Sequence, residues 1–165
     1  MQKFFRSEEK AVMRKILFIC TGNTCRSPMA EAIFKHKTNN RYEVKSAGIF
    51  AHDGSSASPH SIEILTKQAI PIEHKSKMLT TELVAWSDVI LTMGNSHKQI
   101  ILQRYPKAGD KVFSLKEFAQ NSKADIADPF GGTLDDYEKT YNEIEEAIQK
   151  LIEKLENKGS HRAED

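Results

Sequence analysis

Hydrophobic residues follow two patterns that alternate along this chain. Short apolar or alternating runs predict β-strands at residues 15–19, 41–46, 88–93 and 111–115. The segments between and after these runs carry capping residues and apolar residues three or four positions apart, which predicts α-helices. Strands separated by helices form βαβ units, which place parallel strands in one sheet with helices on both faces. The pattern therefore predicts an α/β fold with three layers, built on a doubly wound, four-stranded parallel sheet.

The first two helices are predicted from prolines and capping residues. Ser27 is the expected N-cap of the first helix, with Pro28 at its first position and residues 29–34 in its body. Pro59 begins the second helix, after a loop at residues 48–58 that is rich in Gly, Ser and Ala. One face of the second helix is expected to carry three apolar residues, namely Ile62, Leu65 and Ala69.

Two further helices are predicted around the third strand. Thr80 or Thr81 is expected to cap a short helix that runs through Trp86. Asn95 or Ser96 is expected to cap the helix that follows the third strand. The second of these helices is expected to end near Tyr105-Pro106.

The C-terminal part of the chain combines a long polar loop with a long amphipathic helix. The loop covers residues 119–135 and contains Asp128; loops of this length in compact domains tend to be functional. In the helix, apolar residues recur at spacings of three and four, so one face packs on the core. These residues are Tyr137, Tyr141, Ile144, Ile148, Leu151 and Leu155.

The length of 165 residues predicts one domain, at residues 13–157. Residues 1–12 are interpreted as an N-terminal extension and residues 158–165 as a frayed tail. A net charge of +1 gives no reason to expect a nucleic-acid partner, and no apolar run approaches the length of a membrane span. We therefore expect neither a nucleic-acid nor a membrane partner. We also expect a monomer.

Candidate chemistry lies between the first strand and the first helix. Cys20 heads this loop and Arg26 ends it, with five residues between them. Backbone N–H groups, a helix start and a fixed cation lower the pKa of a thiol, and the same groups can hold a phosphoryl group. Gly22 and Asn23 suit a tightly curled backbone, and Ser27 can donate a hydrogen bond to the thiolate. The alternative is a buried cysteine before an ordinary turn, but the order of these residues favours a cysteine-dependent phosphatase loop.

The sequence of this loop resembles a known family. Cys20-Thr21-Gly22-Asn23-Thr24-Cys25-Arg26-Ser27-Pro28 resembles the signature loop of the low-molecular-weight protein tyrosine phosphatases. Asp128-Pro129-Phe130 is similar to that family's general-acid loop, and Ser46-Ala47-Gly48 also matches; the resemblance covers about residues 13–155. Thr24 stands where tyrosine phosphatases usually carry an aliphatic residue, and the acid loop reads Asp-Pro-Phe-Gly-Gly. In both details the sequence most resembles the bacterial protein arginine phosphatase branch of the family.

The resemblance implies a two-step hydrolysis without a metal or other cofactor. Cys20 would attack phosphorus, Arg26 would hold the phosphoryl oxygens, and Asp128 would protonate the leaving atom and then activate water. The expected partners are phosphorylated proteins or peptides, and phosphate. A catalytic thiolate must stay reduced, so the expected location is the cytoplasm. Residues expected to bind substrate are Thr21, Gly22, Asn23, Thr24, Cys25, Ser27, Phe50 and Phe130.

Several side chains have more than one interpretation. Phe50 and Phe130 are either apolar walls beside the substrate or lids over the core. By position in the family, His74 and Asp88 brace the loop, and a structural role is the safer interpretation of His74. Asp125, three residues before Asp128, is the competing acid.

The resemblance also suggests a redox role for Cys25, which could form a reversible disulfide with Cys20. The alternative is that Cys25 is a small, packed thiol.

Other functions are compatible with the same loop. A phosphotyrosine phosphatase is the main alternative to a phosphoarginine phosphatase. Arsenate reduction occurs on this fold but needs relay cysteines, and the chain has only two cysteines. A non-catalytic anion-binding domain would usually have lost the thiol, the arginine or the acid, and all three are present.

Overall fold

The computed structural model describes residues 13–164, with side chains described through residue 157. Its strands are β1 (Lys15–Cys20), β2 (Glu43–Gly48), β3 (Val89–Thr92) and β4 (Val112–Ser114). Its helices are α2 (Arg26–Thr38), α3 (Pro59–Lys67), α4 (Thr81–Trp86), α5 (Asn95–Arg104), the 3₁₀ helix η1 (Pro106–Ala108), α6 (Leu115–Gln120) and α7 (Leu134–Glu164). The expected extension at residues 1–12 lies outside the described residues, as do the side chains of the expected tail at 158–165. The domain boundaries therefore stay a prediction.

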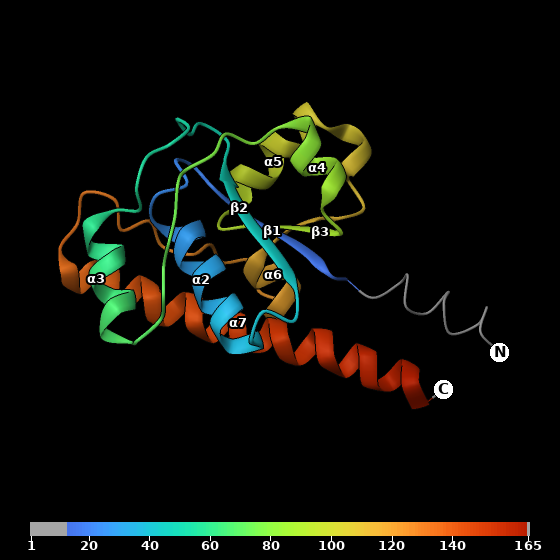
Figure 1. The fold of residues 1–165 in the computed structure, drawn as a ribbon. Coiled ribbons are helices and arrows are strands. Elements are labelled where there is room, and N and C mark those ends of the chain that lie inside the picture. The colour runs from blue at the N-terminus through green and yellow to red at the C-terminus, as the bar shows by residue number, and fades with distance from the viewer. Residues whose placement is uncertain (1–12, 165) are drawn as a thin grey trace.

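The four strands form one parallel sheet in the order β2-β1-β3-β4, as the sequence pattern predicts. Helices α2, α3, α6 and α7 cover one face, and α4, α5 and η1 cover the other (Figure 1). Alternate residues of β1 enter the two cores: Ile16 and Phe18 pack under α2 and α7, and Leu17 and Ile19 pack under α5. The predicted three-layer, doubly wound architecture is confirmed.

The sheet order places the end of β1 in the middle of the sheet's carboxyl edge. β1 pairs with both β2 and β3, so Cys20 at its end has strands on either side. Ligands of such sheets bind at this edge, where the strand order reverses. The loop after β1 is therefore held on both sides by the loops that follow β2 and β3.

Two of the predicted helix starts differ from the structure. The prediction that Ser27 caps α2 is wrong: the helix begins at Arg26 and Cys25 holds the N-cap position, with no side-chain cap. Ser27 is buried in the first turn, because its hydroxyl bonds to the loop instead. Asn95 and Ser96 are not N-caps either, because Gly94 occupies that position in α5. Thr80 caps α4 as predicted, accepting a hydrogen bond from the N–H of Leu83.

Two other predictions about helices need correction. The inner face of α3 consists of Ser61, Ile64 and Leu65. Ile62 is exposed, and Ala69 lies beyond the helix end with a φ of 57°. α6 was not predicted from the sequence; in it, Ser114 and Glu117 form a capping box directly after β4. The polar loop that carries Asp128 is thus shorter than expected, running from residue 121 to residue 133.

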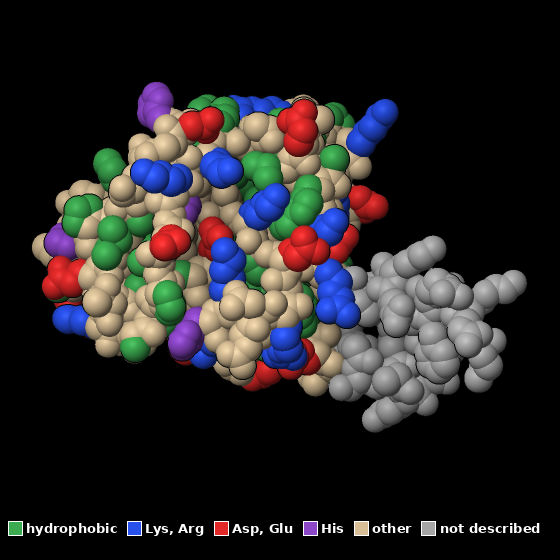
Figure 2. Space-filling view, in the orientation of Figure 1, with side chains coloured by type: hydrophobic (Ala, Val, Ile, Leu, Met, Phe, Trp, Pro, Cys, Tyr) green, Lys and Arg blue, Asp and Glu red, His purple; other side chains and the backbone are tan. Residues whose placement is uncertain are grey.

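The visible face of the molecule carries mixed charge. On the face in Figure 2, lysine and arginine side chains are interspersed with aspartate and glutamate side chains. Within residues 13–164, no helix is both long enough and apolar enough to cross a membrane.

Candidate active site

The loop from Thr21 to Cys25 curls tightly at the carboxyl edge of the sheet. Asn23 adopts a positive φ of 58°, which asparagine tolerates better than most residues. Gly48, at the end of β2, lies directly against the loop: a Cβ there would clash with the carbonyl oxygen of Thr21 and lie 2.9 Å from the nitrogen of Asn23. Among the described residues, none accepts a hydrogen bond from the backbone N–H groups of residues 22–25. The loop therefore presents unpaired donors, as an anion site requires.

Asn23 ties the loop to its surroundings from behind. It is fully buried, and its Nδ2 donates to the hydroxyls of Ser27 and Ser46 at 2.8 and 2.9 Å. Its Oδ1 accepts the backbone N–H of Lys77 at 2.9 Å, and its backbone carbonyl accepts from Nε2 of His74 at 2.7 Å. Four hydrogen bonds thus fix a single residue in a strained backbone conformation. His74 braces the loop, as expected.

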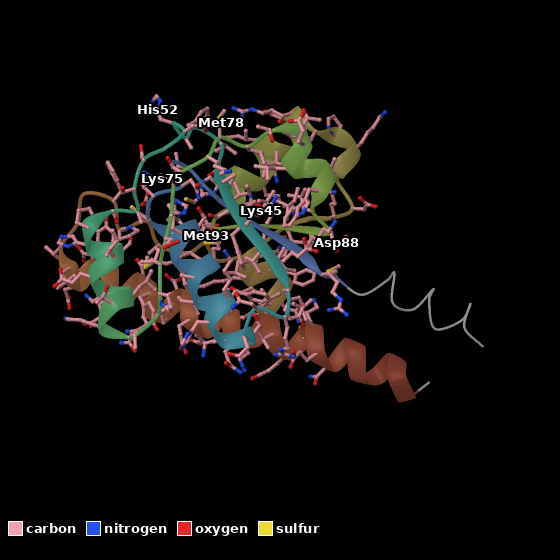
Figure 3. All side chains as sticks on the ribbon, viewed as in Figure 1. Lys45, His52, Lys75, Met78, Asp88 and Met93 are labelled. Carbon is pink, nitrogen blue, oxygen red and sulfur yellow. The ribbon has the colours of Figure 1, made fainter. Side chains whose placement is uncertain are left out.

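Asp88 does not brace the loop. It precedes β3, so it lies at the amino edge of the sheet, where its Oδ2 accepts the backbone N–H groups of Arg14 and Lys15 at 2.9 Å each. Figure 3 shows Asp88 at the opposite end of the sheet from His52, which lines the site. The expectation that Asp88 braces the loop is therefore wrong, and its role is to join the starts of two strands.

The side chain of Ser27 is the hydrogen-bond partner of the Cys20 thiol. The Sγ and Oγ atoms lie 2.9 Å apart. Because the Ser27 oxygen already accepts from Asn23, its own hydrogen is available to donate to the sulfur. A hydroxyl that donates to sulfur stabilises the thiolate over the thiol. The residue expected to cap the helix thus has an electrostatic role beside Cys20.

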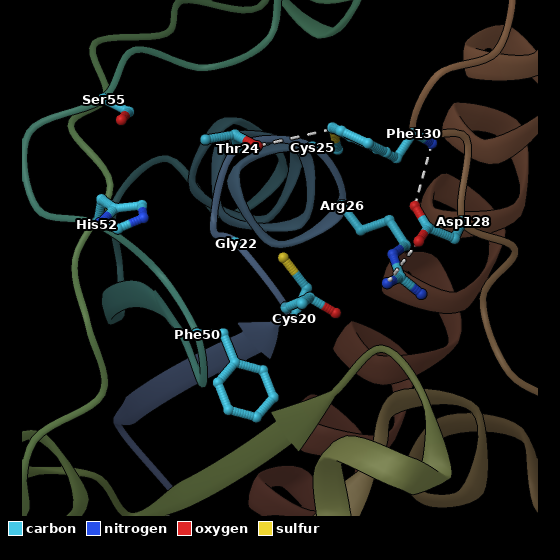
Figure 4. A pocket seen from close by; sticks show the side chains of 11 residues that line it. Cys20, Gly22, Thr24, Cys25, Arg26, Phe50, His52, Ser55, Asp128 and Phe130 are labelled. Carbon is cyan, nitrogen blue, oxygen red and sulfur yellow. Dashed lines mark hydrogen bonds and ion pairs between the residues drawn. The ribbon is translucent and has the colours of Figure 1, made fainter.

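A guanidinium and a carboxylate face each other beside the thiol. Arg26 is 7% exposed, and its Nη1 donates to the carbonyl of Ile126 at 3.0 Å. Its Nη2 lies 3.6 Å from Oδ2 of Asp128, whose side chain is 55% exposed. Oδ1 of Asp128 accepts the N–H of Phe130 at 3.1 Å, which holds the carboxylate at the cavity (Figure 4). The pair therefore combines a buried, fixed cation with a carboxylate that solvent and substrate can reach.

The structure separates the two candidate acids. Asp128 lines the cavity, whereas Asp125 does not. Oδ1 of Asp125 instead accepts the N–H of Asn95 at 2.9 Å and so satisfies a donor at the start of α5. Only Asp128 is positioned to meet a group bound in the loop.

The cavity has a volume of about 420 Å³ and opens between two aromatic side chains. Phe50 is 59% exposed and Phe130 is 79% exposed, so neither is a lid over the core. Figure 4 shows Cys20 pointing into the space between them. Arg104 lies over the ring of Phe50, 5.3 Å from its centroid, and donates to the carbonyl of Ile49. The lining consists of Cys20, Thr21, Gly22, Thr24, Cys25, Arg26, Phe50, His52, Ser55, Asp128 and Phe130.

Two residues expected to bind substrate lie behind the loop and two unexpected ones line the cavity. Asn23 and Ser27 are buried and are absent from the lining, so they hold the loop that faces the cavity. His52 and Ser55 line the cavity but were missed, because the loop that carries them has no pattern to mark them. The other expected substrate-binding residues all lie on the lining.

Cys25 is a free, buried thiol, like Cys20. Its Sγ lies 3.4 Å from the hydroxyl of Tyr137 and 3.8 Å from Oγ1 of Thr24. Burial, together with the hydrogen bond to Cys25, raises the pKa of Tyr137 to about 12. Tyr137 is thus a neutral, buried side chain on the inner face of α7, as the sequence pattern indicated. A disulfide between Cys20 and Cys25 stays a prediction.

His97 also contacts the loop, and the sequence did not predict this. Its Nε2 lies 2.9 Å from Oγ1 of Thr21, and its Nδ1 accepts the N–H of Gly94 at 3.1 Å. Burial, and then the positive charge of Arg26, lower its pKa to about 4. Thr21 and His97 are 76 positions apart, and a histidine inside a short polar helix carries no signal of such a contact.

These groups are suited to one kind of chemistry. Unpaired N–H groups and a guanidinium can bind the oxygens of a phosphoryl group, with the sulfur of Cys20 behind it and the carboxylate of Asp128 at the cavity. Comparisons with known proteins agree. Residues 15–161 match the family model described as low molecular weight phosphotyrosine protein phosphatase.

The chain matches individual relatives over nearly the whole length of each relative. The protein-arginine-phosphatase of Geobacillus stearothermophilus is 46% identical over 142 residues, which covers 86% of this chain and 96% of that protein. The low molecular weight protein-tyrosine-phosphatase PtpB of Staphylococcus haemolyticus is 39% identical over 137 residues, covering 83% and 96%. Among solved structures, a mutant of the YwlE arginine phosphatase with a phosphorylated active-site serine superposes with a TM-score of 0.84 at 44% identity, covering 86% of this chain and 95% of that one.

Proposed function

Since the chain belongs to the low molecular weight phosphotyrosine protein phosphatase family, we propose that it hydrolyses phosphoarginine on proteins through a phosphocysteine intermediate. Its similarity to a protein-arginine-phosphatase over nearly the whole of that protein supports this assignment. The family acts on phosphorylated proteins, so the substrate class follows from membership. The choice of phosphoarginine within that class rests on Thr24.

The first step transfers the phosphoryl group to sulfur. The thiolate of Cys20 attacks phosphorus, so an S–P bond forms as the P–N bond to the arginine side chain breaks. Arg26 and the N–H groups of the loop bind the phosphoryl oxygens and offset their charge. Asp128 gives its proton to the leaving nitrogen, which keeps the electron pair of the P–N bond, so the arginine side chain departs as a guanidinium ion. The exposed position of Asp128 suits this proton transfer, because the leaving group faces the mouth of the cavity.

The second step releases phosphate. The carboxylate of Asp128 removes a proton from a water molecule, which attacks phosphorus as the S–P bond breaks. The sulfur leaves as a thiolate, and the hydroxyl of Ser27, 2.9 Å away, donates to it. The negative charge on the phosphoryl oxygens is offset in both steps, because the guanidinium of Arg26 lies beside the loop throughout.

Thr24 is the residue that favours phosphoarginine over phosphotyrosine. It lines the cavity, and within residues 13–157 the only polar partner of its Oγ1 is Sγ of Cys25, 3.8 Å away. Its hydroxyl is therefore available to a bound substrate. A phosphorylated guanidinium brings N–H donors close to phosphorus, and a phenyl ring brings only carbon. A hydroxyl at this point favours the polar group and an aliphatic side chain would favour the ring.

The alternative function is a phosphotyrosine phosphatase. The two exposed aromatic side chains at the mouth, Phe50 and Phe130, can pack against a tyrosine ring, although they can equally stack on a planar guanidinium. The similarity to the tyrosine phosphatase PtpB supports this alternative. Aromatic walls thus suit both substrates, whereas the hydroxyl of Thr24 suits one.

One pair of substrates decides between the two functions. Two peptides of the same sequence, one with phosphoarginine and one with phosphotyrosine at the same position, are compared by kcat/KM. We expect the phosphoarginine peptide to be preferred, and Cys20→Ser to hydrolyse neither. A preference for phosphotyrosine would replace the proposal with the alternative.

The chemistry also bears on the setting in which the protein works. A thiolate nucleophile needs a reducing compartment, because its oxidation stops turnover. A cytoplasmic location, a monomeric state and the absence of a nucleic-acid partner belong to the same proposal.

A further inference from the structure

His97 is a buried ionisable side chain that the two chemical steps do not use. It lies in the first turn of α5 and is 4% exposed. Its contact is with Thr21, the residue that follows Cys20 and lines the cavity. An inference about this pair deepens the proposed function and rests on it, because Thr21 lines the cavity and His97 contacts Thr21 without lining the cavity itself.

The hydrogen bonds of His97 determine its tautomer. A backbone N–H can only donate, so the Nδ1 atom that accepts from Gly94 carries no hydrogen, and the ring hydrogen lies on Nε2. Protonation would bring an Nδ1–H against the N–H of Gly94. Burial and the positive charge of Arg26 lower the pKa of His97. Together they outweigh the negative charges of Asp125 and Asp128, which raise it. At neutral pH, His97 is therefore an uncharged donor through Nε2.

This donor fixes the hydroxyl of Thr21. Because Nε2 donates to Oγ1, the hydroxyl oxygen acts as an acceptor there, and its own hydrogen remains for another partner. Within the described part of the chain, Oγ1 of Thr21 has no polar partner besides His97. The Thr21 residue is exposed to the cavity, beside the N–H groups of the loop.

The atoms of a bound phosphoryl group supply the missing partner. Its oxygens are anionic acceptors, and a hydroxyl already polarised by an N–H donor is a good donor to them. We propose that His97 is a positioning residue that holds the Thr21 hydroxyl as a hydrogen-bond donor to the phosphoryl group of substrate and product. Thr21 then adds a side-chain donor to the backbone N–H groups and Arg26.

Binding of inorganic phosphate tests this proposal. Phosphate is the product with either phosphoarginine or phosphotyrosine, so the result does not depend on which substrate the enzyme prefers. Thr21→Val should weaken phosphate binding, measured as a competitive inhibition constant, roughly tenfold to a hundredfold, as for a lost hydrogen bond to a charged group. His97→Phe should weaken it by about threefold to tenfold, because the hydroxyl remains but is no longer held.

Two further variants separate positioning from a general effect on the fold. The double variant Thr21→Val, His97→Phe should bind phosphate as Thr21→Val does, since both changes act through one hydrogen bond. His97→Gln places an amide N–H near the position of Nε2 and should restore most of the affinity lost in His97→Phe. His36→Gln, at an exposed position of α2, is the matched control and should leave phosphate affinity unchanged.

Three results would overturn the proposal. These are unchanged phosphate affinity in Thr21→Val, effects of the two single changes that add in the double variant, and a His97→Gln variant as weak as His97→Phe. Nitrogen NMR of the unaltered protein gives an answer even where a variant does not fold. We expect His97 to remain the neutral Nε2–H tautomer between about pH 5 and pH 8. A titration of His97 within that range would also overturn the proposal.

Discussion

Replacing the Thr24 hydroxyl by a methyl group isolates the feature on which substrate choice is proposed to rest. Thr24→Val keeps the shape of the side chain, and Thr24→Ile reproduces the aliphatic type of residue usual in tyrosine phosphatases. The backbone carbonyl of Thr24, which accepts the N–H of Ser58 at 2.8 Å, is unaffected by either change. The loop should therefore keep its conformation.

The magnitude follows from the loss of one hydrogen bond to the substrate. Among the described residues, Oγ1 of Thr24 has only a weak contact with Cys25, so little is lost there when the hydroxyl is removed. In the phosphoarginine complex, the substrate N–H would lose its partner at a cost of about 1–3 kcal/mol, roughly 5- to 150-fold in rate. Phosphotyrosine turnover should rise, because an aliphatic side chain packs better against the ring.

The assay is the ratio of kcat/KM for the two matched peptides in the unaltered protein and in each variant. Thr24→Ser retains the hydroxyl and serves as the control, with a ratio near that of the unaltered protein. If the ratio stays the same in Thr24→Val and Thr24→Ile, Thr24 does not select the substrate. The similarity to tyrosine phosphatases would then carry more weight than this residue.

Two variants and two chemical treatments test the rest of the site. Asp128→Asn should slow leaving-group expulsion by about 10²–10⁴ without weakening phosphate binding, and turnover of a substrate with a very good leaving group should be less affected. If Asp125→Asn gives the larger loss in kcat, the wrong carboxylate has been assigned. Iodoacetate should label Cys20 before Cys25, which bonds to a buried tyrosine, and phosphate should protect Cys20; equal labelling that ignores phosphate would contradict the proposed nucleophile. Mild peroxide should join Cys20 to Cys25 and stop turnover until dithiothreitol is added, whereas sulfinic acid on Cys20 alone, detected by mass spectrometry, would refute a protective disulfide. Gly48→Ala should lower both the melting temperature and phosphate affinity, because its methyl group meets the Thr21 carbonyl; unchanged affinity would mean that the loop can move aside.

Local patterns predicted the parts of the fold that depend on neighbouring residues. β1, its loop and α2 follow from an apolar run and a loop of fixed spacing, so they were found with nearly correct bounds. α6 could also have been found, since Ser114 and Glu117 have the spacing of a capping box. It was missed because that signal lies at the end of a strand, where the two elements share residues.

Contacts between distant residues could not be predicted in the same way. The start of α5 was misplaced because one of its N–H groups is satisfied by Asp125, which is 30 positions away, and not by its own first residues. The pairing of His97 with Thr21 has the same character. The position of Asp88, in contrast, could have been deduced: it precedes a parallel strand, so it must lie at the edge opposite Cys20.

Trapping the enzyme during turnover tests the central claim most directly. The protein is mixed with a phosphoarginine peptide, quenched in acid within the first turnover, digested and analysed by mass spectrometry. We expect one phosphoryl group on the peptide that contains Cys20, in the unaltered protein and in Asp128→Asn, and none on that peptide in Cys20→Ala. Normal release of phosphate from the peptide, with no phosphoryl group on Cys20 at any time, would contradict a phosphocysteine mechanism.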